Sequence, residues 1–214
     1  MSDIVLATFE PRKKPLQARS IVTVEAIYEA TIQVLLSEGI KRTTTTRVAE
    51  RAGVSVGTLY QYYPNKQSLL FAVLEVKFSK VSEAMETACK HARGKPVAEI
   101  VKDAVEAFVD AKMKRVDVST ALYRISADIG GPELVKRFNQ QLQKALEAAL
   151  TTAPDAALRH DSFTIQMMIA AMAGATRSVL EAGASLAIVK NLRHHLVMLC
   201  QSYLVAAAQN GTRQ

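Results

Sequence analysis

Hydroxyl, amide and basic side chains between residues 44 and 66 have the chemistry to bind the phosphates and base edges of a nucleic acid. Hydroxyls and cations bind phosphate oxygens, and amide or guanidinium groups can pair with base edges. We expect these side chains to form one DNA-binding surface. Its candidate members are Thr44, Thr46, Arg47, Ser55, Val56, Gly57, Thr58, Gln61, Tyr62 and Lys66.

Two of these groups stand where short helices are expected to begin. Thr44 and Thr46 can cap the first helix or donate to a phosphate, because the amides at a helix start favour an anion. Ser55 is expected to cap the second helix, whose first turn would meet base edges, with Gly57 letting the backbone approach closely. We expect base specificity to come from DNA shape and from Arg47, Val56, Thr58 and Gln61.

The tyrosines and the lysine that follow are expected to divide between the DNA and the core. Tyr62 offers a phenol to a phosphate, whereas Tyr60 and Tyr63 are expected to pack inward. Lys66, at the start of the next helix, is expected to add a point charge against the backbone. These contacts would position the protein without reading sequence.

Three small or apolar residues are spaced to hold the two short helices at a fixed angle. Ala49 stands where crossing helices come closest, Gly53 can adopt the left-handed turn, and Leu59 can fill the joint from the second helix. This is the spacing of a helix-turn-helix, in which the second helix enters the major groove.

The distribution of charge supports a surface for phosphate. The chain has 214 residues, 49% of them hydrophobic, and a net charge of +7, which alone suits nucleic acid, an anionic membrane surface or mere solubility. Residues 12–66 contain nine Lys or Arg and four Glu, and so contribute five of those seven charges. The positive charge therefore gathers on the segment with the expected helix-turn-helix.

The chain is expected to work in the cytoplasm. Its two cysteines, Cys89 and Cys200, lie far apart in apolar helical contexts, which favours buried thiols in a reducing compartment. No secretory leader is recognised, and the longest apolar run, Met167 to Ala175, is shorter than the ~18 residues of a membrane span.

Apolar residues recur with a helical period throughout, which predicts an all-α protein with about nine helices. We expect a basic arm at 1–19, a helix-turn-helix domain at 20–66 and a ligand-binding and dimerisation domain at 67–214. Outside the helix-turn-helix, helices are expected over 20–37 and 65–92, from Pro96 onward, and over 119–129. Further helices are expected from Pro132 to a loop at 151–155, over 161–181 and over 185–208. Gly39 is expected to end the first of them.

Residues Ser20 to Leu74 resemble the DNA-binding domain of the TetR family of bacterial transcriptional regulators. The resemblance covers about a quarter of the chain, and Gln67 and Ser68 replace an acidic residue that is frequent there. The residues that carry it are Thr44, Val48-Ala49, Ala52-Gly53-Val54-Ser55, Gly57-Thr58-Leu59-Tyr60, Tyr62-Tyr63, Asn65-Lys66 and Leu69-Leu70.

The resemblance implies a homodimeric repressor on a palindromic operator. It implies that the last two helices of each subunit form a four-helix bundle, and that a small molecule in the C-terminal domain shifts the helix over 65–92 and releases DNA. Side chains expected at the interface are Ala170, Gly174, Leu192, Leu196, Leu199 and Tyr203.

Methionine, aromatic and polar side chains of the C-terminal domain are candidates for a ligand pocket, although such residues at helical spacing are more often core. The candidates are Met85, Cys89, Phe108, Met113, Tyr123, Arg124, Phe138, Phe163, Gln166 and Met167. The four histidines form no spacing typical of a metal site. Because no arrangement of nucleophile, base and orienting group is recognised, we expect neither an enzyme nor a cofactor.

A second hypothesis remains open. The chain could be an all-helical small-molecule carrier or enzyme in which the N-terminal hairpin only stabilises the core. Salt-dependent retention on duplex DNA distinguishes the two, because phosphate contacts give a steep loss of affinity with ionic strength.

Overall fold

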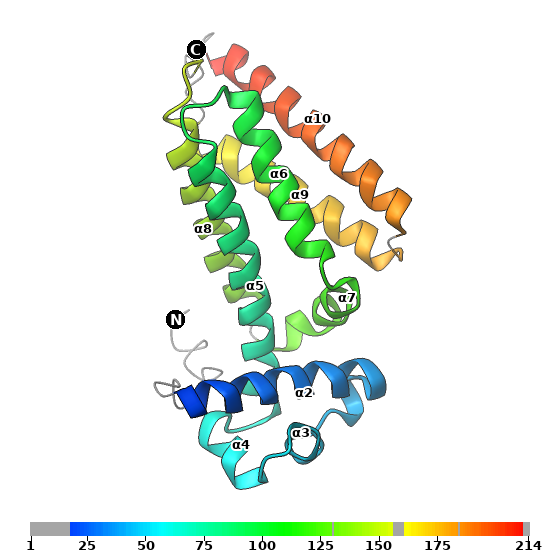
Figure 1. The fold of residues 1–214 in the computed structure, drawn as a ribbon. Coiled ribbons are helices and arrows are strands. Elements are labelled where there is room, and N and C mark those ends of the chain that lie inside the picture. The colour runs from blue at the N-terminus through cyan, green and yellow to red at the C-terminus, as the bar shows by residue number, and fades with distance from the viewer. Residues whose placement is uncertain (1–17, 130, 156–160, 184, 212–214) are drawn as a thin grey trace. The chain divides into compact units, whose positions relative to one another are not determined.

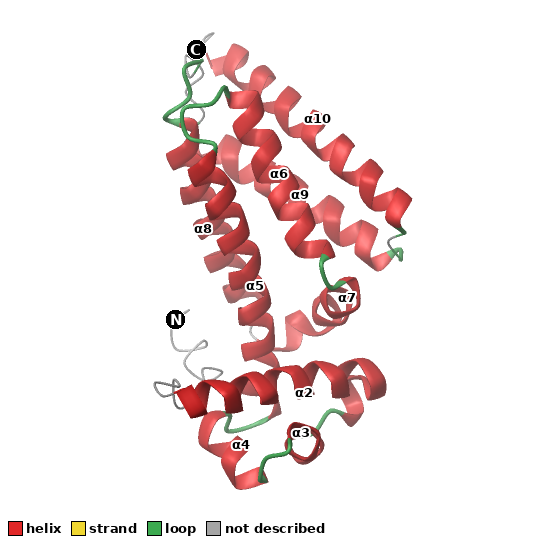
Figure 2. Cartoon of the chain, viewed as in Figure 1, coloured by secondary structure: helices red, strands yellow, loops and turns green. Residues whose placement is uncertain are grey.

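The computed structural model describes residues 18–129, 131–155, 161–183 and 185–211. These residues form nine α-helices and one 3₁₀ helix, and they contain no strand (Figures 1 and 2). The predicted all-α class is therefore confirmed. The helices are α2 (Ala18–Arg42), α3 (Thr45–Ala52), α4 (Val56–Tyr62), α5 (Lys66–His91), α6 (Val97–Met113), α7 (Val116–Ile125), η1 (Ser126–Ile129), α8 (Gly131–Leu150), α9 (Ser162–Glu181) and α10 (Leu186–Gly211).

The chain divides into two compact units. The first unit takes the residues up to Lys77 together with 120–135, and the second takes 78–119 together with 136–214. The first unit thus extends beyond the expected 20–66 segment into α5. Most of the expected basic arm, residues 1–17, lies outside the described residues, and Ala18 and Arg19 already belong to α2.

Helix α2 supplies one wall of the first unit. Ile27, Ala30 and Val34 lie on one face and are buried, as spacings of three and four residues require. Gly39 was predicted to end this helix, and it does break it, with φ 76° and ψ 171°. Helical hydrogen bonding then resumes for one short turn to Arg42, which the sequence pattern did not predict.

The second unit is built on α6. Its predicted stripe of Val97, Val101, Ala104 and Phe108 is buried, and the helix packs against α9 and α10. Asp161 caps α9 by accepting the Thr164 amide at 2.6 Å. The predicted extents of the C-terminal helices agree with the structure to within a few residues.

Two helices, α2 and α9, are long and apolar enough to cross a bilayer by length and composition alone. Core helices of globular proteins pass the same test, and both helices bury one face in their own unit. Each helix also has exposed apolar side chains, such as Val22 on α2 and Phe163 on α9, so packing within the unit accounts for only part of its apolar content.

Candidate nucleic-acid interface

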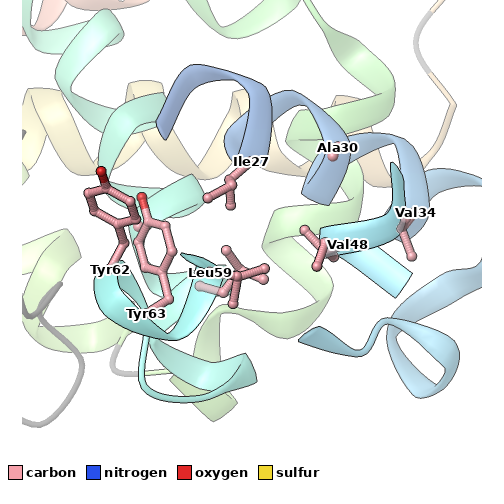
Figure 3. Close-up of a cluster of buried hydrophobic side chains, with 10 residues drawn as sticks. Ile27, Ala30, Val34, Val48, Leu59, Tyr62 and Tyr63 are labelled. Atoms are coloured by element: carbon pink, nitrogen blue, oxygen red, sulfur yellow. The ribbon is translucent and has the colours of Figure 1, made fainter. Parts of the chain in front are cut away.

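A small apolar core sets the angle between α3 and α4. Val48 and Ala49 of α3 and Leu59 of α4 are fully buried and pack with Ile27 of α2 (Figure 3). The packing roles predicted for Ala49 and Leu59 are confirmed. Substitution of either residue by a larger one should spread the two helices, because both side chains are fully buried between them.

The turn between the two short helices depends on Gly53. Its φ of 67° and ψ of 29° are left-handed, and its amide donates to the carbonyls of Ala49 and Glu50. The Val54 amide also reaches the Ala49 carbonyl, at 3.0 Å. A Cβ added to Gly53 would meet no atom within 4 Å, so glycine is required here by backbone conformation and not by space.

The start of α3 is exposed and capped. Thr44 has an extended conformation, and its hydroxyl accepts the Arg47 amide at 3.3 Å, so the predicted cap is confirmed. Thr44 and Thr46 are both exposed to solvent. The positive end of this helix is therefore open to an anion.

Helix α4 has the predicted serine cap. The Ser55 hydroxyl accepts the Thr58 amide at 3.0 Å and lies 2.8 Å from the Thr58 hydroxyl. Ser55, Gly57 and Gln61 are exposed, and Val56 is half-buried. The leading turn of α4 is thus open to solvent, and the hydroxyl of Thr58 is held by Ser55.

The structure reverses the expected roles of the tyrosines. Tyr62, predicted to contact phosphate, is only 8% exposed, and Tyr63 packs beside it with ring centroids 6.5 Å apart (Figure 3). Tyr60, predicted to pack inward, is 41% exposed, and its hydroxyl lies 3.1 Å from that of Thr45. The predictions for Tyr62 and Tyr60 were therefore wrong.

Helical geometry explains this reversal. Leu59 points into the core, and residues three and four positions later share its face, which turns Tyr62 and Tyr63 inward. Tyr60 follows Leu59 directly and lies about 100° away around the helix. Burial raises the pKa of Tyr63 to about 12, with further contributions from Glu75 and Tyr62, so its hydroxyl stays neutral. The buried position of Leu59 was the sequence signal that distinguishes these tyrosines.

Arg47 and Lys66 both have partners within the first unit. The Arg47 guanidinium pairs with Glu38 of α2. The Lys66 ammonium donates to the backbone carbonyl of Ile40, next to the kink in α2. Both cations were expected at DNA, and each is held in place by these contacts.

Asn65 and Ser68 fix the start of α5. The Asn65 side chain accepts the Ser68 amide at 2.8 Å, and the Ser68 hydroxyl accepts the Asn65 amide at 3.2 Å. This reciprocal pair forms a capping box. The start of α5 is therefore capped without an acidic residue at 67 or 68.

Residues predicted to line a ligand pocket are divided between the two units and between buried and exposed positions. Met85, Cys89, Phe108 and Phe138 are buried and Met113 half-buried in the second unit, whereas Tyr123 and Arg124 belong to the first unit and Arg124 is exposed. Phe163, Gln166 and Met167 are exposed on α9, so the expectation that they line an interior pocket was wrong. The adjoining face of α9, with Ile165, Met168, Ile169 and Met172, is the buried one.

Two of the predicted interface residues belong to the protomer core. Leu192 and Leu196 are buried and share a face of α10 with Cys200 and Leu204, at intervals of four residues. They cannot also face a second subunit, and that prediction was wrong. Ala170 and Gly174 on α9 and Leu199 on α10 are exposed, and Tyr203 is half-buried.

Sequence reasoning missed Lys112, which is only 3% exposed in the second unit. Its ammonium lies 4.8 Å from the ring centroid of Phe78, 5.6 Å from that of Phe108 and 5.1 Å from that of Phe138. Aromatic faces stabilise a buried cation. Its position four residues after Phe108, in line with the apolar stripe of α6, was the available signal.

No group of three or more His, Cys, Asp or Glu residues within the described ranges could hold a metal ion. His194 and His195 lie with ring centroids 5.5 Å apart and are both exposed on α10.

Comparison with known proteins agrees with this architecture. Residues 27–73 match the model of bacterial regulatory proteins of the tetR family, and residues 96–204 match that of the tetracyclin repressor-like C-terminal domain. The fatty acid metabolism regulator protein of Bacillus subtilis is 32% identical over 60 residues, or 28% of this chain and 31% of that protein. The repressor KstR of Mycolicibacterium smegmatis is 37% identical over 62 residues, or 29% and 30% of the two chains.

Solved structures share the fold over most of the chain. The fatty acid degradation regulator FadR of Bacillus halodurans has a TM-score of 0.64 at 19% identity, covering 86% of this chain and 96% of that one. SmeT, the repressor of a Stenotrophomonas maltophilia multidrug efflux pump, has a TM-score of 0.64 at 20% identity, covering 84% and 88%. The curated relatives are matched over only about a third of their length. Because the family models cover both the helix-turn-helix (the DNA-binding head, α2 to α4) and the C-terminal helices, the chain belongs to the TetR family of bacterial regulatory proteins.

Proposed function

We propose that this protein is a dimeric transcriptional repressor of the cytoplasm that binds a palindromic operator and is released by a small-molecule effector. The observation that carries the proposal is that the serine-capped leading turn of α4 and the start of α3 are both exposed, while α3 and α4 are joined by the contact between the Thr45 and Tyr60 hydroxyls. In a helix-turn-helix these two features meet base edges and phosphate, respectively.

The contacts with DNA follow from the exposed donors. Thr44, Thr46 and the hydroxyl of Tyr60 supply neutral donors for phosphate, and Gln61 supplies an amide for a base edge. Tyr60 thus takes the role first expected of Tyr62. The exposed cations Lys41, Arg42 and Arg51 add a field that attracts the duplex.

A second copy of the chain is the proposed partner of the outer faces of α9 and α10. Phe163 and Met167 are 64% and 44% exposed, and together with Ala170 and Gly174 they form a stripe at offsets of zero, four, seven and eleven. Exposed apolar stripes of this kind mark association surfaces. Large exposed apolar residues of α10 are Ile188, Met198, Leu199 and Val205.

Gly174 offers a direct test of this dimer. A Cβ at Gly174 would meet nothing within 4 Å in the protomer, so Gly174→Leu should leave the fold intact. It should weaken the dimer by overpacking the partner, with Gly174→Ala giving a smaller effect. Sedimentation measures the dimer mass, and an unchanged dimer in Gly174→Leu would place the interface elsewhere.

Selection of DNA from a random pool tests the repressor proposal. We expect a palindrome whose half-sites lie about one helical turn, or a multiple of it, apart, and a steep loss of affinity as salt rises. Weak, salt-insensitive retention on duplex DNA would instead favour the carrier or enzyme hypothesis.

A further inference from the structure

A groove lies in the second unit between the C-terminal part of α5 and the middle of α8. Its volume is about 270 Å³. The α5 side is formed by Glu86, Cys89, Lys90 and, just past the helix end, Arg93, at the spacing of one helix face. Gln141, Lys144 and two alanines of α8 form the other side.

Hydrogen bonds between distant parts of the chain fix both ends of the groove. Ser82, one turn before Glu86, donates to the side-chain carbonyl of Gln141 at 3.2 Å. The amide of Gly94, next to Arg93, donates to the Thr152 hydroxyl at 2.9 Å. The separation of the two walls is therefore set by the fold.

Three cations face this groove without an ion pair. Lys90, Arg93 and Lys144 are exposed, and among the described residues none of them pairs with a carboxylate, although Glu86 lines one end. The three cations are not needed to cap the C-terminus of α5, because backbone amides already donate to carbonyl oxygens there. The Ala92 amide, for example, donates to the Ala88 carbonyl at 2.9 Å. The groove thus offers cationic donors to an anion from both walls.

The base of the groove is apolar and chemically quiet. Cys89 is almost fully buried, and burial, with smaller contributions from Glu86 and Asp103, raises the pKa of its thiol to about 11. The thiol is therefore neutral at physiological pH and contributes apolar surface, not a nucleophile. The alanines of α8 continue this surface.

We propose that the groove binds a small organic dianion with a short apolar body, such as an aliphatic dicarboxylate. Arg93 and Lys90 would bind one anionic group and Lys144 the other. Glu86 and Arg93 are seven positions apart, which corresponds to ~10 Å along a helix axis, so the groove has the length of a short-chain dicarboxylate. An effect of this ligand on the affinity for DNA rests on the proposed function, whereas binding of the ligand to the groove does not.

Calorimetric titration of the full-length protein without DNA tests this site. The probes are adipate, inorganic phosphate and the neutral adipamide, all at one ionic strength. We expect adipate to bind and adipamide not to bind. Lys144→Gln and Arg93→Gln should each weaken adipate binding by about three- to tenfold, because each removes a partly exposed charge contact. Lys136→Gln, an exposed cation elsewhere on α8, is the matched control and should change nothing.

Each outcome decides for or against the groove. Phosphate binding with the same dependence on Lys144 and Arg93 would support an anion site for a phosphate group instead of a dicarboxylate. Equal heats for adipate and adipamide, or an equal loss in Lys136→Gln, would overturn the proposal. Failure of both anions together with weaker duplex binding by Lys144→Gln would assign these cations to nucleic acid. If adipate binds but the protein never retains DNA, the repressor proposal fails and the groove stands.

Discussion

The two units hold their polar side chains in different ways. In the first unit the helix-capping hydroxyls bond three residues along the chain, as in Thr44 with Arg47 and Ser55 with Thr58. In the second unit Ser82 bonds Gln141, 59 residues away, and Lys112 lies between aromatic rings of three helices. The caps of the DNA-binding helices therefore depend on local sequence, whereas the polar contacts of Ser82 and Lys112 in the C-terminal unit depend on tertiary packing.

Because of this difference, substitutions in the two units should affect different properties of the protein. A substitution in the head should misplace a few side chains and reduce DNA affinity with a limited loss of stability. A substitution at a buried polar site of the second unit should lower the free energy of unfolding and leave the DNA contacts of the remaining folded protein intact.

Gly53→Val should have the largest effect and abolish DNA binding. A β-branched residue at φ 67° costs about 1–3 kcal/mol of backbone strain, and its relief would move α4 away from α3. A mobility-shift assay measures the loss. Gly53→Asn should retain much of the affinity because Asn tolerates the left-handed conformation.

Gly94 provides the matched control in the second unit. It also has a positive φ, of 78°, so Gly94→Val should cost similar stability. DNA affinity should nevertheless remain near that of the wild type. Equal loss of DNA binding in both variants would contradict the contrast between the units.

Lys112→Ala should lower the free energy of unfolding by about 2–4 kcal/mol. The substitution removes the contacts of the stem and ammonium with Phe78 and Phe138 and leaves a cavity. Lys112→Met keeps most of the volume and should cost less. Urea denaturation measures both variants, and equal stability of Lys112→Ala and the wild type would show that the aromatic contacts contribute nothing.

These cases also show what could be predicted from the sequence. The caps at Thr44 and Ser55 and the turn at Gly53 were predictable because each depends on residues within four positions. Lys112 was not, since its aromatic neighbours Phe78 and Phe138 are brought together only by tertiary packing. The roles of Tyr60 and Tyr62 were exchanged in the prediction because α4 is short. The inward direction of Leu59 identifies the residues three and four positions later as the buried ones.

The C-terminal helices illustrate a further difficulty. Both faces of α9 and of α10 contain apolar residues, so periodicity alone could not tell the core face from the outer one. Leu196 and Leu199 are three residues apart, yet the first is buried and the second exposed. The predicted pocket residues Phe163 and Met167 are therefore exposed, and the predicted interface residues Leu192 and Leu196 are buried.

The two helix caps allow a comparison of smaller effects. Ser55→Ala and Asp161→Ala should each cost about 1 kcal/mol, because each removes the acceptor for an amide at a helix start. Only Ser55→Ala should reduce DNA affinity, since it frays the leading turn of α4. Thermal denaturation and mobility shift separate the two quantities, and a DNA defect in Asp161→Ala would contradict the local character of the head.

Lys66→Ala should have the smallest effect of these substitutions. It tests whether the start of α5 contributes a phosphate contact. An ammonium has three donors, so the contact with the Ile40 carbonyl leaves others for a phosphate. We expect affinity to fall alike for all DNA sequences and the salt slope to flatten by about one unit. An unchanged slope with a lower melting temperature would instead make Lys66 a purely structural tie between the start of α5 and the end of α2.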